Sequence, residues 1–282
     1  MKITPPRLIV AALLAASATS ASSQTLGAAS NYDIFALNGG KIELKDANQL
    51  FGQVAISNGA ELDAKNKSTT FTGTIFKHTG GSIKDGGGLN PSGGIITSPA
   101  TDSAINQANA DIESYVTYLS GLTATQSYGK QNDSFSYSSM MSLSVLDFTE
   151  LDLDKESFTL NGQAGGTDQI IIRVSKDFEF KESNLVLNNL DVDNVIWYYS
   201  GNDKFDLHKS ADKPEDFMKF AGTIIALDGE VRLGEVDFTG RVIGGNLKLG
   251  SGFEFTGTVP EPSSSLMLVI GAGSLLLVRR RK

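Results

Sequence analysis

Two pairs of acidic residues are the part of the sequence that comes closest to a chemical site. Asp152 and Asp154 lie in the run LDLD, and Asp191 and Asp193 lie in LDVDN. Side chains two positions apart share one face of a β-strand, so each pair could offer oxygen ligands to calcium. Known calcium loops need a third ligand and a glycine that these runs lack. We therefore interpret both as half-solvated strands and expect no metal site.

Other catalytic residues lack the spacing that their chemistry needs. The two histidines, His78 and His208, are far apart in sequence, and no G-x-S-x-G motif occurs. A glycosidase pairs carboxylates that are adjacent in space rather than in sequence, and nothing here selects such a pair. The glycine-rich run 80–94 has neither of the spacings that bind phosphate, the Walker spacing or G-x-G-x-x-G between a strand and a helix. We expect no catalytic and no cofactor-binding residue, and a protein that is not an enzyme.

Composition excludes several further classes of protein. The chain has 282 residues, a net charge of -8 and no cysteine. Nucleic acid is not an expected partner, because phosphate neutralisation needs clustered Lys and Arg. Disulfides and thiolate chemistry are excluded, so an exported chain of this kind must be stabilised by a long core.

The elements that must position any site are clearest in residues 220–258. Short apolar alternations recur there between charged residues, and each is closed by glycine. Period two with one solvated face predicts short β-strands, which must stack on similar strands. Thr-Gly-x followed by an aliphatic residue recurs at Thr239, Thr256 and Thr72, with a looser copy at Phe51. We predict a mainly β fold, a β-solenoid with one long helix packed alongside.

Further strands are expected on both sides of the helix. They are predicted at residues 32–37, 41–44, 53–56, 61–63, 69–77, 151–153, 158–160, 170–174, 178–180, 185–187 and 195–198. The strand at 170–174 has no alternation, which predicts cover on both sides. Run 80–94 is predicted to be a flexible loop, 122–141 a loop or weak strands, and 203–219 a surface excursion.

The helix is predicted at residues 99–120. Ser98 is the expected N-cap, Pro99 the first helical residue and Gly121 the C-cap glycine. Apolar residues fall at helical spacing, which predicts packing along one flank of the solenoid: Ile105, Ala108, Ile112, Tyr115, Val116 and Leu119.

Residues 1–23 have the order of a secretory signal. Lys2 and Arg7 precede an apolar run at 8–16, and small residues follow. Cleavage after Ala18, Ala21 or Ser23 fits equally well.

The tail, residues 259–282, resembles the PEP-CTERM sorting signal of Gram-negative bacteria that make exopolysaccharide. The resemblance rests on Pro260, Glu261 and Pro262, an apolar run at 266–278, and a basic end that includes Arg279, Arg280 and Arg281. It implies processing by an exosortase, and then release or retention at the surface. The apolar run is about 20 Å long as a helix, which suits a transient inner-membrane anchor better than a permanent transmembrane helix.

The solenoid domain, residues 24–258, resembles the choice-of-anchor A family and the ice-binding-like solenoids. The resemblance is carried by the opening LGAASNY, by VIWY at 195–198, and by FAGTIIA leading to GRVIG at 240–244. It implies an adhesin-like surface protein without catalytic residues, associated with extracellular matrix, exopolysaccharide or another surface ligand.

Ice binding is the alternative function. An ice-binding solenoid is expected to present a flat face of small hydroxyl or apolar residues, and the sequence offers hydroxyls in strand context only at 68–74. The outward positions of the best-patterned stretch are charged and strongly hydrated instead, which favours adhesion: Glu230, Arg232, Glu235, Asp237, Lys248 and Glu254.

Overall fold

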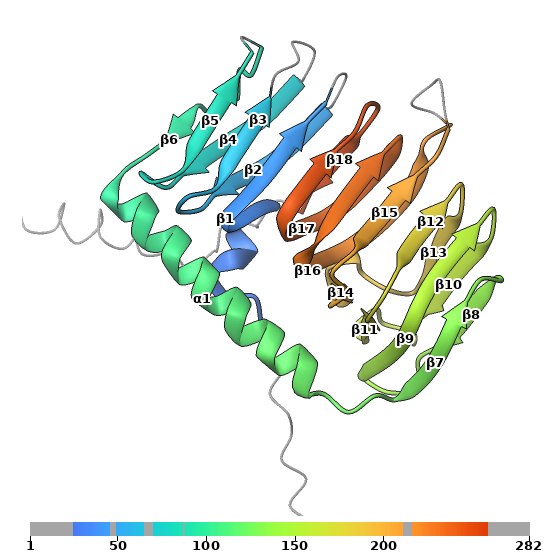
Figure 1. The fold of residues 1–282 in the computed structure, drawn as a ribbon. Coiled ribbons are helices and arrows are strands. Elements are labelled where there is room, and N and C mark those ends of the chain that lie inside the picture. The colour runs from blue at the N-terminus through green and yellow to red at the C-terminus, as the bar shows by residue number, and fades with distance from the viewer. Residues whose placement is uncertain (1–24, 46–48, 65–69, 87, 211–215, 259–282) are drawn as a thin grey trace, which may run out of the picture.

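The computed structural model describes residues 25–45, 49–64, 70–86, 88–210 and 216–258. Within them the fold is mainly β with one long α-helix, as predicted (Figure 1). The strands are β1 (Ile34–Leu44), β2 (Gln49–Ile56), β3 (Glu61–Ala64), β4 (Thr70–Lys77), β5 (Ser82–Asp85), β6 (Ile95–Ile96), β7 (Gln126–Gln131), β8 (Phe135–Ser138), β9 (Leu143–Asp154), β10 (Ser157–Asn161), β11 (Gln169–Val174), β12 (Phe178–Lys181), β13 (Asn184–Asn188), β14 (Val195–Tyr199), β15 (Lys204–His208), β16 (Met218–Gly234), β17 (Val236–Leu249) and β18 (Glu254–Gly257). The helix is α1 (Pro99–Gly121), and η1 (Gly27–Asn31) and η2 (Val192–Asn194) are 3-10 turns.

Every strand pairing in the described part of the chain is parallel. The strands β14, β11, β9, β12, β15 and β16 close a ring, because β14 also pairs with β16. Long strands bend from one side of the stack to the next: β16 pairs with β14 through 223–226 and with β15 through 230–234. The stack therefore has three sides. The helix side includes residues 34–36, 223–226 and 241–244, the charged side includes 41–44, 230–233 and 246–249, and the third side includes 218–221, 236–239 and 254–256.

The two ends of the described chain meet in the middle of the stack. β18, near the C-terminal end, pairs with β17 and β2, and β1, near the N-terminal end, pairs with the same two strands. Figure 1 shows blue β1 beside the red strands β17 and β18. Gln53 N–H donates to the buried carboxylate of Asp33, just before β1, at 2.8 Å. The last described residue, Thr258, thus lies at the centre of the stack.

The repeated Thr-Gly-x-aliphatic turn is a corner between the third side and the helix side. The strand registers align its glycines, Gly222 with Gly240 and Gly52 with Gly73. All four have φ between +122° and +151°, which L side chains rarely adopt. A Cβ on Gly240 would lie 2.0 Å from the carbonyl oxygen of Gly222, so the corner needs glycine for close approach as well as for φ. The predicted stacking of these motifs is confirmed.

Helix α1 runs along the helix side from β6 to β7 (Figure 1). Ser98 accepts a hydrogen bond from Thr101 N–H at 3.1 Å, which confirms it as the N-cap. All six predicted stripe residues are buried against outward side chains of the sheet, among them Phe35, Ile225 and Ile243. The prediction for Gly121 is wrong, because the helix includes Gly121 and its C-cap is Leu122.

The main core fills the interior of the stack and is rich in aromatic rings. Phe178 and Phe205 stack with centroids 3.7 Å apart, and the fully buried Trp197 meets Phe178 edge-on at 5.7 Å. A second core lies between the sheet and α1. Ile170 and Ile172 belong to the first core and Ile171 to the second, so the predicted cover on both sides of β11 is confirmed.

Three predicted boundaries are wrong for one reason, the pairing of strands distant in sequence. The run 80–94, predicted to be a loop, contains β5, which is held by β3. The excursion 203–219 contains β15, whose Phe205 and Leu207 are buried between β12 and β16. The predicted short strands of 220–258 merge into the long strands β16 and β17, and residues 32–44 into β1. In the run 122–141, the weak strands β7 and β8 form.

Candidate functional site

Three of the four acidic residues singled out in the sequence lie in ion pairs, and the fourth, Asp191, is exposed directly before η2. Asp152 points outward from β9 and lies 2.7 Å from Lys130, and Asp154 lies 3.5 Å from Lys181. Asp193 pairs with Arg241 at 2.7 Å, but the strand predicted for LDVDN is wrong, since residues 192–194 form the turn η2. The three paired carboxylates are neutralised by cations of the chain itself, and the described residues contain no group of three or more metal-ligating side chains.

The two histidines lie in separate surroundings. Nδ1 of His78 accepts a hydrogen bond from Gly80 N–H at 3.0 Å, in the turn after β4. His208 ends β15 beside Asp206 and Glu179, at 3.4 and 3.9 Å. The structure does not bring them together into an acid–base pair.

The charged side of the stack is a continuous ladder of charged residues. One outward row crosses eight strands in register and every member is charged: Lys84, Asp63, Glu43, Lys248, Arg232, Asp206, Glu179 and Asp152. Ion pairs link neighbouring strands, such as Lys84 to Glu61 at 2.7 Å and Lys248 to Glu230 at 2.6 Å. The hydrogen bonds that Lys130 Nζ donates to Asp152 and Glu150 raise the pKa of Lys130 above its usual value. Asp63 and Asp206 are buried and pair with Lys41 and Lys204. The other six side chains are exposed or half-buried and hold water strongly, so this face is solvated.

The predicted outward charges divide between two sides. Glu230, Arg232 and Lys248 lie on the charged side, whereas Asp237 and Glu254 face outward in register on the third side. Glu235 lies in the turn between β16 and β17 with φ +50°, and burial raises its pKa.

A separate sheet of β8, β10 and β13 carries uncharged polar side chains. Its outward rows join Ser136 to Thr159 and Val186, and Ser138 to Asn161 and Asn188. Asn188 Nδ2 donates to Asn161 Oδ1 at 2.8 Å, so the amides form a ladder. The expectation that only residues 68–74 offer stacked hydroxyls is wrong, because the pairing of β8 and β10 was not apparent from the sequence.

The run 68–74 does not make one flat face. Thr72 and Thr74 lie on opposite sides of the Gly73 corner, and residues 68 and 69 are outside the described part of the chain. On the third side, Thr72 lies in a row with Phe51, Thr256, Thr239 and Ala221.

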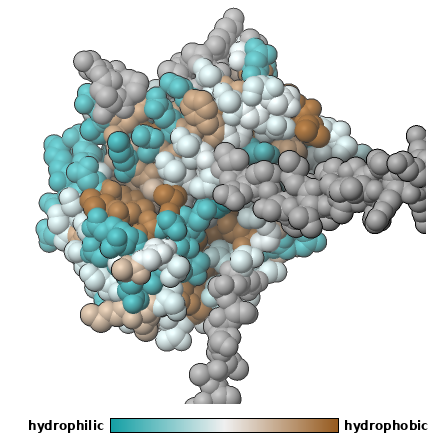
Figure 2. Space-filling model, turned by 180° about the vertical axis from the view of Figure 1, so that it is seen from behind, coloured by the Kyte–Doolittle hydropathy of each residue, from teal (hydrophilic) through white to brown (hydrophobic). Residues whose placement is uncertain are grey.

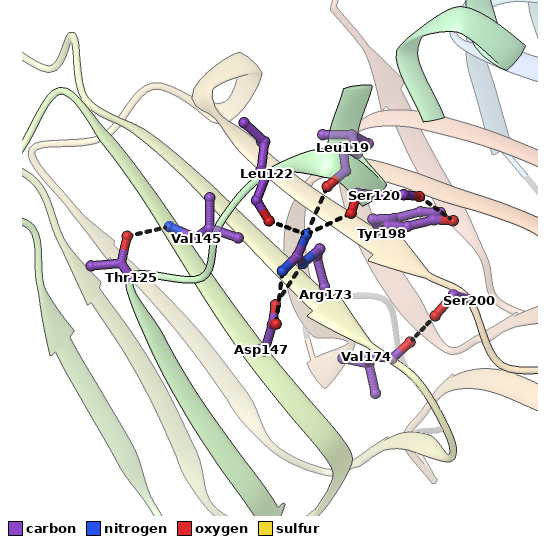
Figure 3. A network of polar contacts seen from close by, with 10 residues as sticks. All are labelled: Leu119, Ser120, Leu122, Thr125, Val145, Asp147, Arg173, Val174, Tyr198 and Ser200. Atoms are coloured by element: carbon purple, nitrogen blue, oxygen red, sulfur yellow. Dashed lines mark hydrogen bonds and ion pairs between the residues drawn. The ribbon is translucent and has the colours of Figure 1, made fainter. Parts of the chain in front are cut away.

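A groove of about 440 Å³ lies where α1 ends (Figure 3). One row on its floor comes from adjacent strands in register: Ser127, Asp147, Arg173 and Tyr198. A second row of exposed hydroxyls lies two residues further along three of these strands, within β9 at Thr149 and directly after β11 and β14 at Ser175 and Ser200. The sequence did not reveal this site, since Asp147, Arg173 and Tyr198 come from three strands that only the register aligns.

Arg173 is the central polar group of the groove. Its Nε and Nη2 donate to both carboxylate oxygens of Asp147 at 2.5 and 2.7 Å. Its Nη1 donates to the carbonyl oxygens of Leu119 and Leu122, at the end of α1, at 2.8 and 2.9 Å. Figure 3 shows the guanidinium lying between the carboxylate and these carbonyls. The pair fixes the end of the helix and one wall of the groove together.

Exposed apolar side chains are scattered. Figure 2, the view from behind, shows brown patches broken up by teal and white surface. The large exposed hydrophobic residues in the described ranges are Phe51, Ile95, Ile96, Met140, Met141 and Val186.

A family model described as "Putative Ice-binding-like adhesive domain" matches residues 11–255. The chain belongs to this family. A PEP-CTERM protein-sorting motif follows the ice-binding-like adhesive domain at residues 258–282, which implies export, surface sorting and processing by an exosortase. The domain match does not carry the choice-of-anchor A label, which stays a resemblance.

Solved structures share the fold of the ice-binding-like adhesive domain. An ice-binding protein from an Antarctic bacterium, Flavobacteriaceae, matches with a TM-score of 0.56 and 15% identity over 86% of this chain, which spans 48% of that protein. One from the Antarctic ascomycete Antarctomyces psychrotrophicus matches with 0.53 and 17%, over 85% and 100% of the two chains. A glycosylated one from an Arctic yeast matches with 0.54 and 15%, over 86% and 97%. Comparison with curated proteins finds no match.

The predicted processing residues lie outside the part of the chain that the structure describes. Pro260, Glu261, Pro262, Arg279, Arg280 and Arg281 fall within the matched sorting motif, and their individual roles stay predictions. The same holds for the signal segment 1–23 and the apolar run 266–278. Within the described ranges, no helix has the length and apolar character needed to cross a membrane.

Proposed function

We propose that this chain is an exported, surface-sorted adhesive protein that is not an enzyme and that associates with extracellular matrix or exopolysaccharide. The observation that carries the proposal is the order of two matches in one chain, an adhesive domain at 11–255 and a sorting motif at 258–282. We further propose the domain division 1–23, 24–258 and 259–282, with the stacked strands as the coils of a β-solenoid.

The position of Thr258 supports this role. The sorting motif begins at the centre of the stack, where β18 lies between β17 and β2, and not at one of its ends. An attachment there, directly after β18 on the third side, leaves both ends of the stack and the charged side free of the anchor. Processing releases the domain from a transient inner-membrane anchor or retains it at the cell surface.

The non-enzymatic assignment rests on the state of the candidate groups. Asp152, Asp154 and Asp193 are neutralised by ion pairs, and the groove carboxylate of Asp147 is held by Arg173. A general base needs a free acceptor that reaches its substrate, and these carboxylates are engaged within the fold.

Two measurements test the proposal. Mass spectrometry of the surface and culture fractions is expected to find no peptide beyond about Pro262, and replacing Pro260, Glu261 and Pro262 should leave the protein in the inner membrane. Deleting the gene should weaken surface attachment or biofilm cohesion. Unchanged attachment in the deletion strain, or turnover of an exopolysaccharide by the purified domain, would contradict the proposal.

Ice binding is the second candidate, favoured by the uncharged hydroxyl and amide rows of β8, β10 and β13. Strands about 4.8 Å apart hold these side chains in a regular array. Recrystallisation inhibition by the purified domain at micromolar concentration, abolished by Thr159→Tyr and kept by Thr72→Tyr on the third side, would make ice the ligand. We expect no such activity, because the array is only three strands wide.

A further inference from the structure

We infer that the groove at the end of α1 is a binding site for a neutral saccharide, which rests on the proposed adhesive function and names its ligand class. The groove holds about 440 Å³, within the range of sites for small ligands.

The groove exists because α1 is shorter than the stack that it covers. The helix side follows the strand order β6, β4, β2, β1, β17, β16, β14, β11, β9 and β7. At about 4.8 Å per strand this stack is about 43 Å long. The 23 residues of α1 make a helix of about 35 Å. The last strands before β7 are therefore only partly covered. Ile196, Ile171 and Val145 are buried in the second core with α1, and the outward positions two residues further along the same strands are only half-buried.

The outward side chains of the helix side change from apolar to polar where α1 no longer covers them. Under the helix, the outward row reads Phe35, Ile243 and Ile225, all buried. The same row then continues as Tyr198, Arg173, Asp147 and Ser127. Solvation alone would explain polar side chains in an uncovered row. Here the polar side chains also lie beside a row of exposed hydroxyls and the end of α1, and together these groups form one concave site.

The charges in the groove oppose an ionic ligand. Arg173 donates from Nε and Nη2 to the carboxylate of Asp147, and from Nη1 to carbonyl oxygens at the negative end of the α1 dipole. The cation is therefore already neutralised, and a phosphate or sulfate would have to displace a bidentate carboxylate. A cationic ligand would meet the guanidinium. A neutral ligand would neither have to displace the carboxylate nor be repelled by the guanidinium.

The remaining lining suits a ligand with many hydroxyl groups. Thr149, Ser175 and Ser200 are exposed hydroxyls that both donate and accept. Tyr198 lies on the floor, and Ser120 Oγ donates to its hydroxyl at 3.3 Å. Half-buried tyrosine presents an apolar ring and a polar tip, which match the two kinds of surface on a pyranose.

Affinity electrophoresis tests the inference. The purified domain is run through gels that contain dextran, mannan or the neutral exopolysaccharide fraction of the producing strain. We expect retardation by at least one of them, insensitive to 0.5 M NaCl because no net charge is matched. Ser175→Trp and Thr149→Trp fill the groove from exposed positions and should weaken retardation about tenfold or more. Ser136→Trp, an exposed serine on β8, is the matched control and should behave as wild type.

Three results would overturn the inference: no retardation by any of these neutral polymers, retardation only by anionic alginate that salt removes, or unchanged binding in both folded groove variants. Attachment of cells that carry Ser175→Trp separates this inference from the proposed function. Normal attachment by that variant and weak attachment by the deletion strain would reject the groove and keep the adhesive role. Normal attachment by both strains would reject the role itself.

Discussion

Replacing Gly240 with alanine should destabilise the domain through the glycine corner. Gly240 has φ +139°, and a Cβ there would lie 2.0 Å from the carbonyl oxygen of Gly222 on the neighbouring strand. Real Cβ contacts essentially never fall below 3.0 Å, so one of the two backbones must move by about 1 Å. Both belong to paired strands β16 and β17, and the movement weakens their ladder.

The magnitude follows from three contributions. An L residue at this φ costs about 1–3 kcal/mol. Loss of at least one ladder hydrogen bond costs about 0.5–1.5 kcal/mol. The reduced freedom of the unfolded chain returns about 0.4–1 kcal/mol. We expect a net loss of about 2 kcal/mol, the middle of a range of about 0.5–4 kcal/mol, which for a domain of this size lowers Tm by about 4–8 °C.

Alanine variants at two further glycines distinguish the cost of backbone strain from the cost of a steric clash. The measurement is thermal denaturation followed by circular dichroism. Gly39 has φ +70° with open space around it, so Gly39→Ala should cost only about 1 kcal/mol. Gly234 has neither positive φ nor a close neighbour, so Gly234→Ala should leave stability unchanged or slightly raised. A loss for Gly240→Ala no larger than that for Gly39→Ala would refute the argument from close approach.

Three other predictions concern the helix, the groove and one buried acid. Ile112→Ala should cost about 2–5 kcal/mol in urea unfolding because Ile112 is fully buried between α1 and the sheet, and Glu113→Ala, at the exposed next position of the helix, should cost under about 0.5 kcal/mol. Arg173→Met should speed hydrogen exchange at residues 119–122, whereas Lys130→Met, which breaks an exposed ion pair, should not; equal exchange in both would contradict the anchoring role. Burial raises the pKa of Asp33 from 3.8 to about 6, against a hydrogen bond from Gln53 and the charge of Arg241. The folded state thus binds more protons between these values, and this contribution to stability is lost as the pH rises through 6. Asp33→Asn should therefore raise Tm at pH 8 more than at pH 4.5, and a gain independent of pH would count against the assignment.

Local pattern was sufficient to predict most of the strands. Leu151 and Leu153, Phe178 and Phe180, and the run around Trp197 alternate or cluster as predicted, and each lies in a parallel ladder. The helix followed from the spacing of its buried stripe and from Ser98. Where pattern failed, long-range pairing decided the structure: β15 is highly charged on its outward face, which hid the alternation of its two buried residues.

The groove could not be predicted for a related reason. Arg173 lies 26 residues after Asp147 and 25 before Tyr198, and these separations depend on loop lengths that no local pattern determines. The same holds for the hydroxyl rows of β8, β10 and β13, since an isolated serine-rich strand resembles a polar loop.

The sequence by itself determined the type of element at most positions, the repeated corner and the order of domain and sorting tail, because side-chain period, glycine and compositional blocks are local properties. Only the tertiary structure decided that β1 and β18, from opposite ends of the described chain, both pair with β2 and β17, how far α1 covers the stack, and which polar residues share a face. Those facts depend on register between strands that are far apart in the chain, and register is set by the packing of the whole core rather than by any one segment.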